Sequence, residues 1–218
     1  MPKTFARVNP AIGSHVPLDE LIDLFAEGDE TVANTSFTDL ELYRDRANGC
    51  AFDGVIFKAC TFENVDFSGC TFRDIIFSSC RFIECDMTEC WLNRCDLRGC
   101  SAPGVNLMRS RMSAVSVSAT DLSYANLSET SMERVAFREA KLNEAAVQRS
   151  KLKNVTFDTC ELVKLDVFGT SLAGIDVSSS RFEAPVLSGD FRELRGCAVN
   201  VEQALALSGL LGITLSDE

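Results

Sequence analysis

Residues 50–84 read CAFDGVIFKACTFENVDFSGCTFRDIIFSSCRFIE and carry a phenylalanine at the same place in every unit of five. The seven residues of this core ladder are Phe52, Phe57, Phe62, Phe67, Phe72, Phe77 and Phe82. Steps of five in both directions meet only apolar residues from Phe37 to Leu187, which makes thirty-one units. From Cys50 onward, a small or branched residue lies two positions before each of them. The other three positions of each unit are mostly Asp, Asn, Ser, Arg, Glu and Gly.

This five-residue period decides the fold class. An amphipathic helix repeats every 3.6 residues and a half-buried strand every two, so neither explains a strict period of five. A solenoid explains it, because every unit turns the chain by a fixed angle and sends the same two side chains into the core. We therefore predict a solenoid over most of the chain.

The units themselves resemble a known repeat. CTFEN (60–64), VDFSG (65–69), CDLRG (95–99) and ANLSE (125–129) are similar to the A(D/N)LXX consensus of pentapeptide repeat proteins. The resemblance implies an all-β solenoid, a right-handed quadrilateral β-helix in which four units make one coil. Thirty-one units then form nearly eight coils. At about 4.8 Å between neighbouring strands, they form a rod roughly 37 Å long.

The C-terminal tail narrows the resemblance. The five-residue phase ends after Leu187, and Asn200, with Gln203 three residues on, then begins a predicted helix that Gly212 ends. A C-terminal α-helix and short strand after the last coil are similar to the dimerisation tail of the Qnr-type quinolone-resistance family. This resemblance implies a homodimer through the apolar residues of the tail. These residues are Val201, Ala204, Leu205, Leu207, Leu210, Leu211 and Ile213.

Within that family, the sequence is most similar to the Gram-positive, enterococcal kind. It opens with a non-repeat segment, and its unbroken phase leaves no room for the projecting loops of the proteobacterial members. We predict an N-terminal capping segment (1–34), a pentapeptide-repeat β-helix (35–190) and a C-terminal cap with the dimerisation helix (191–218). The apolar pattern of residues 17–28 predicts a short amphipathic helix, or an irregular first coil, that covers the open end of the solenoid. Its apolar residues are Leu18, Leu21, Ile22, Leu24 and Phe25.

The composition limits the partners. The chain has 32 acidic and 21 basic residues and a formal net charge of −11, which excludes a generic nucleic-acid binder because such affinity depends on Lys and Arg. There is no apolar run of about 18 residues, and the start MPKTFARVNP has no signal-peptide core, so we predict a cytoplasmic protein without a membrane span. The charge is uneven: residues 97–160 carry 6 acids and 9 bases, whereas the rest of the chain is acidic.

Neither the cysteines nor the motifs indicate catalysis. Nine of the ten cysteines lie at the small inward position, which favours buried free thiols. A zinc site is the alternative; its ligands, Cys85, Cys90, Cys95 and Cys100, would point inward from four different walls and lack CxxC spacing. The single histidine, His15, lies outside the repeat, and the sequence has no Gly-rich phosphate loop, GxSxG or HExxH motif. We predict no metal, no cofactor and no enzymatic activity.

Alignment by twenty residues places a candidate acidic face on the rod. One outward column and a nearby one hold Asp66, Asp86, Asn106, Asn126 and Asp166, with Glu89 and Glu129. The alternative is that these Asp and Asn side chains only bind backbone groups in turns, as they commonly do. Arg109 and Arg149 also interrupt the Glu column.

The resemblance to the Qnr-type family implies a function. In that family two rods form a dimer that mimics DNA and binds DNA gyrase and topoisomerase IV, which protects them from quinolones. An acidic rod of about duplex width suits a protein surface that attracts phosphates. The alternative function is an acidic pentapeptide-repeat scaffold that binds another protein partner.

Overall fold

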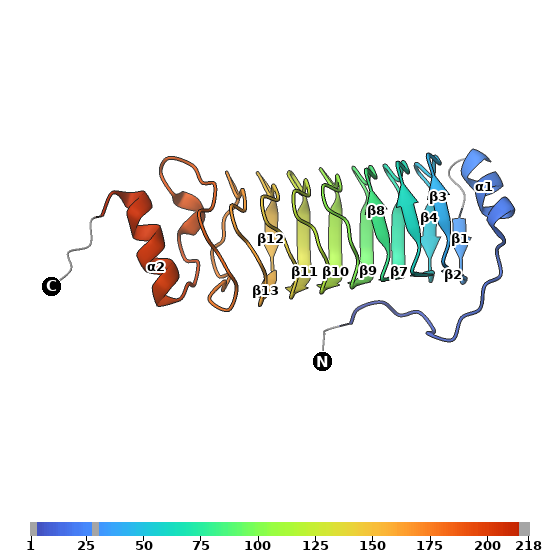
Figure 1. The fold of residues 1–218 in the computed structure, drawn as a ribbon, viewed down its shortest axis with the longest axis horizontal. Helices are drawn as coiled ribbons and strands as arrows, with labels where there is room; N and C mark the ends of the chain where they lie inside the picture. The colour runs from blue at the N-terminus through green and yellow to red at the C-terminus, as the bar shows by residue number, and fades with distance from the viewer. Residues whose placement is uncertain (1–3, 28–30, 214–218) are drawn as a thin grey trace.

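The structure is a computed structural model and describes residues 4–27 and 31–213. It is a straight stack of coils with a helix at each end (Figure 1). In chain order the elements are α1 (Leu18–Glu27), β1 (Thr31–Ala33), β2 (Ser36–Thr38), β3 (Glu41–Tyr43), β4 (Ala51–Asp53), β5 (Ile56–Lys58), β6 (Thr61–Glu63), β7 (Thr71–Ser78), β8 (Arg81–Ile83), β9 (Trp91–Arg98), β10 (Arg111–Ser118), β11 (Ser131–Arg138), β12 (Lys151–Lys153), β13 (Thr156–Asp158), η1 (Arg192–Leu194), α2 (Val201–Ser208) and η2 (Gly209–Leu211).

The strands pair in parallel at a constant offset of twenty residues. One ladder joins Thr31 to Ala51 and continues in the same step through β7, β9, β10 and β11 to Lys151. Isolated bridges carry the same offset on to the pair of Asp166 and Val186. Twenty residues are four units of five, so each coil has four sides, and the predicted β-solenoid fold is confirmed.

We number the four sides of the rod by the central residue of their units. Face 1 holds Phe52, Phe72, Leu92, Met112 and Met132; face 2 holds Phe57, Phe77, Leu97, Val117 and Phe137; face 3 holds Phe62, Phe82, Ala102, Leu122 and Leu142; face 4 holds Phe67, Met87, Leu107, Leu127 and Val147. All of these central residues are buried. In most units the residue two positions later takes a left-handed backbone, with φ of 55° at Asn64 and 59° at Glu129. Gly adopts this conformation at the lowest cost, which is one reason why it recurs at the corners.

Phenylalanine rings fill the core in layers. The seven residues of the core ladder are at most 2% exposed. On faces 1 and 2, rings one coil apart are stacked, with centroids 5.1 Å apart for both Phe52–Phe72 and Phe57–Phe77, whereas on face 3 the rings of Phe62 and Phe82 are tilted by 35°. Rings on adjacent faces meet edge to face, as Phe57 and Phe62 do at 5.5 Å. Such pairs add to the stabilisation that burial itself supplies.

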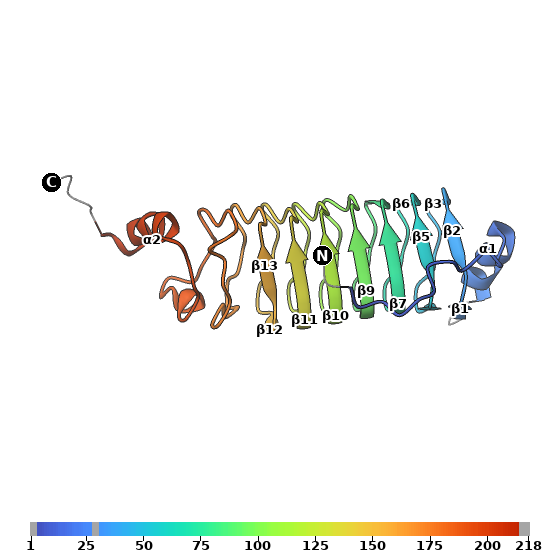
Figure 2. The same cartoon turned by 90° about the horizontal axis from the view of Figure 1, so that it is seen from below.

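The N-terminal part has two roles where we predicted one cap. The helix α1 lies at the open end, where Leu21 and Phe25 are buried and the Phe25 ring lies 6.2 Å from that of Phe52. Ile22 and Leu24 pack partly against the core, whereas Leu18 is 48% exposed. Val16 also packs partly against the core, and residues 12–15 hydrogen-bond to the first coil, whereas residues 4–11 do not cap the end. They run back along the side of the rod as an arm that crosses β7 and β9 (Figure 2).

The regular coils extend from β1 to the coil that precedes η1. The first regular unit is centred on Val32 in β1, one unit before Phe37. After Leu187 the chain forms η1, and its last bridge, Asp176 to Ala198, has an offset of 22 residues. The helix α2 follows, and the predicted short strand after it lies outside the described residues. No helix in the described ranges is long and apolar enough to cross a membrane.

Candidate functional site

The predicted acidic column forms a ladder along face 4. Parallel bridges join Asp66 to Asp86, Asp86 to Asn106, and Asn106 to Asn126, and the ladder continues through Ala146 to Asp166. All five predicted Asp and Asn residues of this column are half-buried. The offset of twenty residues therefore brings them together as the sequence predicted.

Each residue of this column also supports a turn. In every case Oδ1 accepts a hydrogen bond from the backbone N–H two residues later, for example 2.9 Å from Ser68 to Asp66 and 3.0 Å from Thr88 to Asp86. The same bond occurs at Asn106, Asn126 and Asp166. The turn interpretation thus holds for the whole column. It also fixes how these carboxylates are oriented, because an Asx turn restrains the side chain.

The Glu column is not uniformly acidic. Glu89 forms an ion pair with Arg109 at 3.0 Å, and Glu129 follows one coil later. Arg149 comes next, and its guanidinium lies 5.9 Å from the Phe168 ring centre. Charge therefore alternates from coil to coil along this corner, so Glu89 and Glu129 do not extend the acidic surface of Asp66 and Asp86.

Face 1 carries a basic surface that sequence analysis did not assign to a face. At outward positions between residues 31 and 189, face 1 has six bases and three acids, whereas each of the other faces has two more acids than bases. The bases are Arg73, Arg94, Arg111, Arg134, Lys151 and Lys153. The sequence did show the surplus of bases in residues 97–160. Assigning each of these charged residues to a face by the twenty-residue offset would have located the basic surface.

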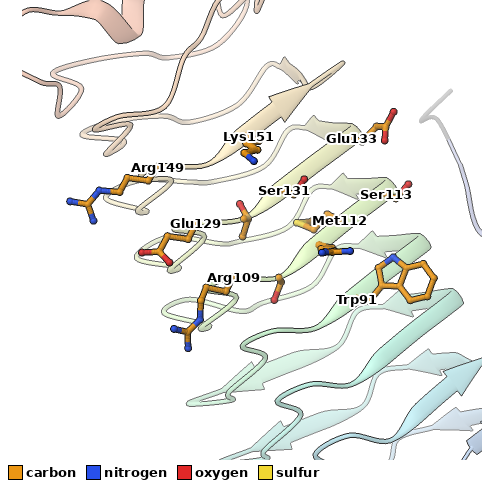
Figure 3. A pocket seen from close by; sticks show the side chains of 12 residues that line it. Trp91, Arg109, Met112, Ser113, Glu129, Ser131, Glu133, Arg149 and Lys151 are labelled. Atoms are coloured by element: carbon orange, nitrogen blue, oxygen red, sulfur yellow. The ribbon is translucent and has the colours of Figure 1, made fainter.

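A groove of about 500 Å³ runs along the corner between faces 4 and 1. Arg109, Glu129 and Arg149 project from successive turns on one side of it, and Trp91 lies at the other (Figure 3). Arg111 and Lys151 line it from the strands β10 and β12. The Trp91 side chain is 41% exposed, with the Arg73 guanidinium 6.0 Å from its ring centre.

Nine of the ten cysteines are buried free thiols, and Cys197 is half-buried. Cys85, Cys90, Cys95 and Cys100 are at most 3% exposed and come from four different faces. Burial raises the pKa of Cys90 and of Cys95 to about 12. The Cys90 thiol donates to the Phe67 carbonyl oxygen at 3.0 Å. In the described part of the chain, no three His, Cys, Asp or Glu side chains are placed to hold a metal ion.

Two carboxylates hold the N-terminal arm. The backbone N–H of Phe5 donates to Asp96 and that of Arg7 to Asp74, both at 2.9 Å. Asp96 is 1% exposed and Asp74 is 8% exposed, although both occupy outward positions. The hydrogen bonds from Arg94 hold the pKa of Asp74 below its ordinary value, against the opposing effect of burial. These contacts were not predicted, because they join backbone groups to residues far apart in the sequence.

The helix α2 leaves an apolar side in solvent. Asn200 and Gln203 form the predicted capping box, and the buried Gln203 amide donates to the carbonyls of Val177 and Ser180 at 3.1 and 2.7 Å. This anchor turns the opposite side of the helix outward. The exposed members of the predicted interface are Val201, Ala204, Leu205, Leu210 and Ile213. Leu207 instead packs against the core, and the Leu211 side chain is outside the described set.

Comparisons with known proteins agree with this architecture. The family model described as pentapeptide repeat region matches residues 90–167, and that described as pentapeptide repeats (8 copies) matches residues 46–74. A parallel solenoid with four five-residue units in each coil is the architecture of this class. The chain is a pentapeptide repeat protein. Neither matching model describes a catalytic family. No curated protein matches the chain.

Two solved structures share the fold. Trypsin-treated QnrB1, a plasmid-mediated fluoroquinolone resistance protein, superposes with a TM-score of 0.53 and 22% identity over 87% of this chain and 91% of that chain. HetL, a pentapeptide repeat protein involved in heterocyst differentiation regulation from the cyanobacterium Nostoc sp. strain PCC 7120, gives 0.51 and 19% over 85% and 94%. At these identities the likeness is one of fold.

Proposed function

We propose that the protein is a non-enzymatic DNA mimic that binds DNA gyrase or topoisomerase IV in the cytoplasm and protects these enzymes from quinolones. Three observations support the proposal: the net charge of −11, the straight rod, and the fold shared with the resistance protein QnrB1. A surface that attracts DNA phosphates also attracts a rod with fixed carboxylates. The uninterrupted twenty-residue offset further favours a relationship to the loop-free, Gram-positive members.

The observation that carries the proposal is the orientation of Asp66 and Asp86. Each uses Oδ1 for its turn, and in the described structure neither Oδ2 has a hydrogen-bonding partner. The two residues lie on neighbouring coils, about 4.8 Å apart. Their turns therefore present two fixed, partly solvated oxygens to a partner at no further cost in side-chain entropy.

The column itself supplies the variant that tests this role. Asn106 and Asn126 make the same turn as their Asp neighbours, so D66N/D86N removes two charges while the turns remain. We expect wild-type protein to restore DNA supercoiling by purified gyrase in the presence of ciprofloxacin. We expect the double variant to need at least about tenfold more protein, because two charge-assisted contacts are lost.

The matched control is D121N/D176N. Asp121 and Asp176 make the same turns, on faces 3 and 2, and the change in charge is equal. The control should protect gyrase as well as wild type does. If neither wild type nor control affects supercoiling or its inhibition, the topoisomerase function is wrong, and the scaffold function gains support from the comparable likeness to the regulator HetL. If D66N/D86N protects normally, the function stands but this contact does not.

We also propose that two rods join through α2. Val201 is 76% exposed and Leu205 is 50% exposed, and Leu210 and Ile213 continue this apolar surface. Large exposed apolar patches mark interfaces, and a dimer would remove this one from water. The acidic variant V201D/L205D should be a monomer by light scattering, whereas A206D, on another side of the helix, should remain a dimer. A monomeric wild type would refute the proposal.

A further inference from the structure

The groove at the corner of faces 4 and 1 has a charge opposite to that of the whole protein. Four bases line it, Arg109, Arg111, Arg149 and Lys151, against two acids, Glu129 and Glu133. We propose that this groove binds an acidic peptide segment of a partner protein, with separate carboxylates at Arg111 and Lys151. This site goes beyond the proposed topoisomerase contact, since the charge it requires in the partner is negative.

Arg111 and Lys151 are available for such contacts. Both are exposed, and neither forms an ion pair with any residue in the described ranges. Other bases nearby are already paired: Arg109 with Glu89 at 3.0 Å, and Lys153 with Glu133 at 2.9 Å. The two available charges therefore keep their attraction for an incoming anion.

The spacing of the two charges favours a peptide. Arg111 and Lys151 lie two coils apart, with Ser131 between them, so their backbones are separated by about 9.6 Å. A polyproline II segment rises about 9.3 Å over three residues, so acidic residues at every third position match this interval. Trp91, one coil before Arg111, offers an exposed ring to an apolar residue at one end of the segment.

The acids in the groove disfavour a nucleic acid. Glu129 lies on the coil between Arg109 and Arg149, and Glu133 lies on the same coil in β11. A phosphodiester backbone has an evenly spaced negative charge and would pass these carboxylates, whereas a peptide can place a neutral residue there. Nucleic-acid affinity also grows with the number of phosphates neutralised, and in the described structure only three bases without an ion pair line this groove: Arg111, Lys151 and Arg149, whose guanidinium lies over the Phe168 ring.

Calorimetric titration with defined probes tests the site. The probes are acetyl-(Glu-Pro-Pro)₄-amide, its Gln counterpart and the oligonucleotide dT12, each added to the full chain at low ionic strength. We expect the Glu peptide to bind and the other two not to bind. Affinity should fall as salt is added, because the contacts are exposed ion pairs. The sole tryptophan, Trp91, should report the same binding by a change in fluorescence.

Charge reversal locates the binding. R111E/K151E should weaken Glu-peptide binding by at least about tenfold, whereas R134E/K164E, with the same change in charge outside the groove, should bind as wild type does. If circular dichroism shows that R111E/K151E does not fold, R111Q/K151Q replaces it in the binding test, and we expect this variant to lose less affinity for the Glu peptide. Absence of binding to the Glu peptide, or equal loss in both variant pairs, would overturn the proposal. Tighter binding of dT12 would overturn it as well.

None of these readouts uses a topoisomerase. Failure of the peptide to bind would leave the supercoiling result unaffected, and failure of the supercoiling assay would leave the calorimetry unaffected. The two proposals are therefore tested separately.

Discussion

Replacing Phe62 by alanine tests whether the phenylalanine core holds the rod together. Phe62 is completely buried, and its ring centre lies 5.5 Å from Phe57, 5.4 Å from Phe67 and 5.0 Å from Phe82. The alanine variant loses the transfer free energy of the ring, the ring contacts and the packing around the cavity. Changes of this kind cost about 3–5 kcal/mol, and the three close ring contacts place F62A at about 4 kcal/mol.

Two further variants serve as controls for the stability loss of F62A. Face 3 carries leucine at the equivalent places Leu42, Leu122 and Leu142, so F62L should cost only about 1 kcal/mol. F168A removes a ring that is 37% exposed and contacts Arg149, so it should cost about 1 kcal/mol or less. Thus the ladder position, rather than phenylalanine as such, should determine the loss.

Urea unfolding provides the assay. Far-ultraviolet circular dichroism follows the solenoid, and the fluorescence of Trp91 follows the coil that contains it. In a solenoid each coil contacts only its neighbours, so a weak coil also destabilises the adjacent ones and both probes should shift. If F62A loses less than about 1 kcal/mol, or no more than F168A, the phenylalanine ladder does not hold the fold.

Three other predictions concern the arm and the C-terminal end. D74A should release the arm and speed trypsin cleavage after Arg7, whereas D53A should not. Alanine is acceptable at position 74 because Ala114, two coils later, has the same left-handed backbone, with φ of 55°. The pKa of Asp74 in the folded state lies below its unfolded value near 3.9, so the Asp74 carboxylate adds to the free energy of unfolding above that pH. This stabilisation is lost as the pH falls through the folded-state pKa. In urea titrations, acid should therefore lower the free energy of unfolding of wild type more than that of D74A. E193Q should cost about 1–3 kcal/mol by urea unfolding, because the buried carboxylate accepts from the backbone N–H groups of Gly169 and Ser188, while the exposed control E183Q should change little.

The solenoid was predictable because its core repeats along the sequence. Every inward residue must be apolar or small, so the period of five is visible in the residues themselves and gives the offset of twenty once four units form a coil. The first unit, at Val32, is apolar and in phase with the predicted series, which began one step later, at Phe37. The capping box of α2 was predictable for a similar reason, since Asn200 and Gln203 are three residues apart.

The arm and the basic groove could not be predicted from the five-residue period. The arm is held through the backbone N–H groups of Phe5 and Arg7, which any sequence supplies, and its acceptors lie 91 and 67 residues away. The groove depends on which bases share a face, and counting charge along the chain mixes all four faces. By contrast, the acidic column follows from the twenty-residue register, and the turn hydrogen bonds of Asp66 and Asp86 are the alternative role that the residue types themselves predicted.

Sorting the charge by face also changes where a topoisomerase should meet the rod. The corner between faces 4 and 1 is lined mostly by bases, so of the two corners that border face 4, the one between faces 3 and 4 should attract a phosphate-binding surface. There Glu84, exposed, lies two residues before Asp86. Glu84 and Glu129 occupy equivalent left-handed corner positions, with φ of 51° and 59°, so E84Q and E129Q are matched in backbone and in charge.

Under the proposed function, these two variants should behave differently. E84Q should reduce the protection of gyrase from ciprofloxacin several-fold, because it removes an exposed charge beside Asp86 on the attractive corner. E129Q should have no effect, because its carboxylate lies between Arg109 and Arg149 on the corner that repels a phosphate-binding surface. Equal losses in the two variants would mean that net charge alone, and not the corner, determines binding. The reverse order would place the contact at the groove.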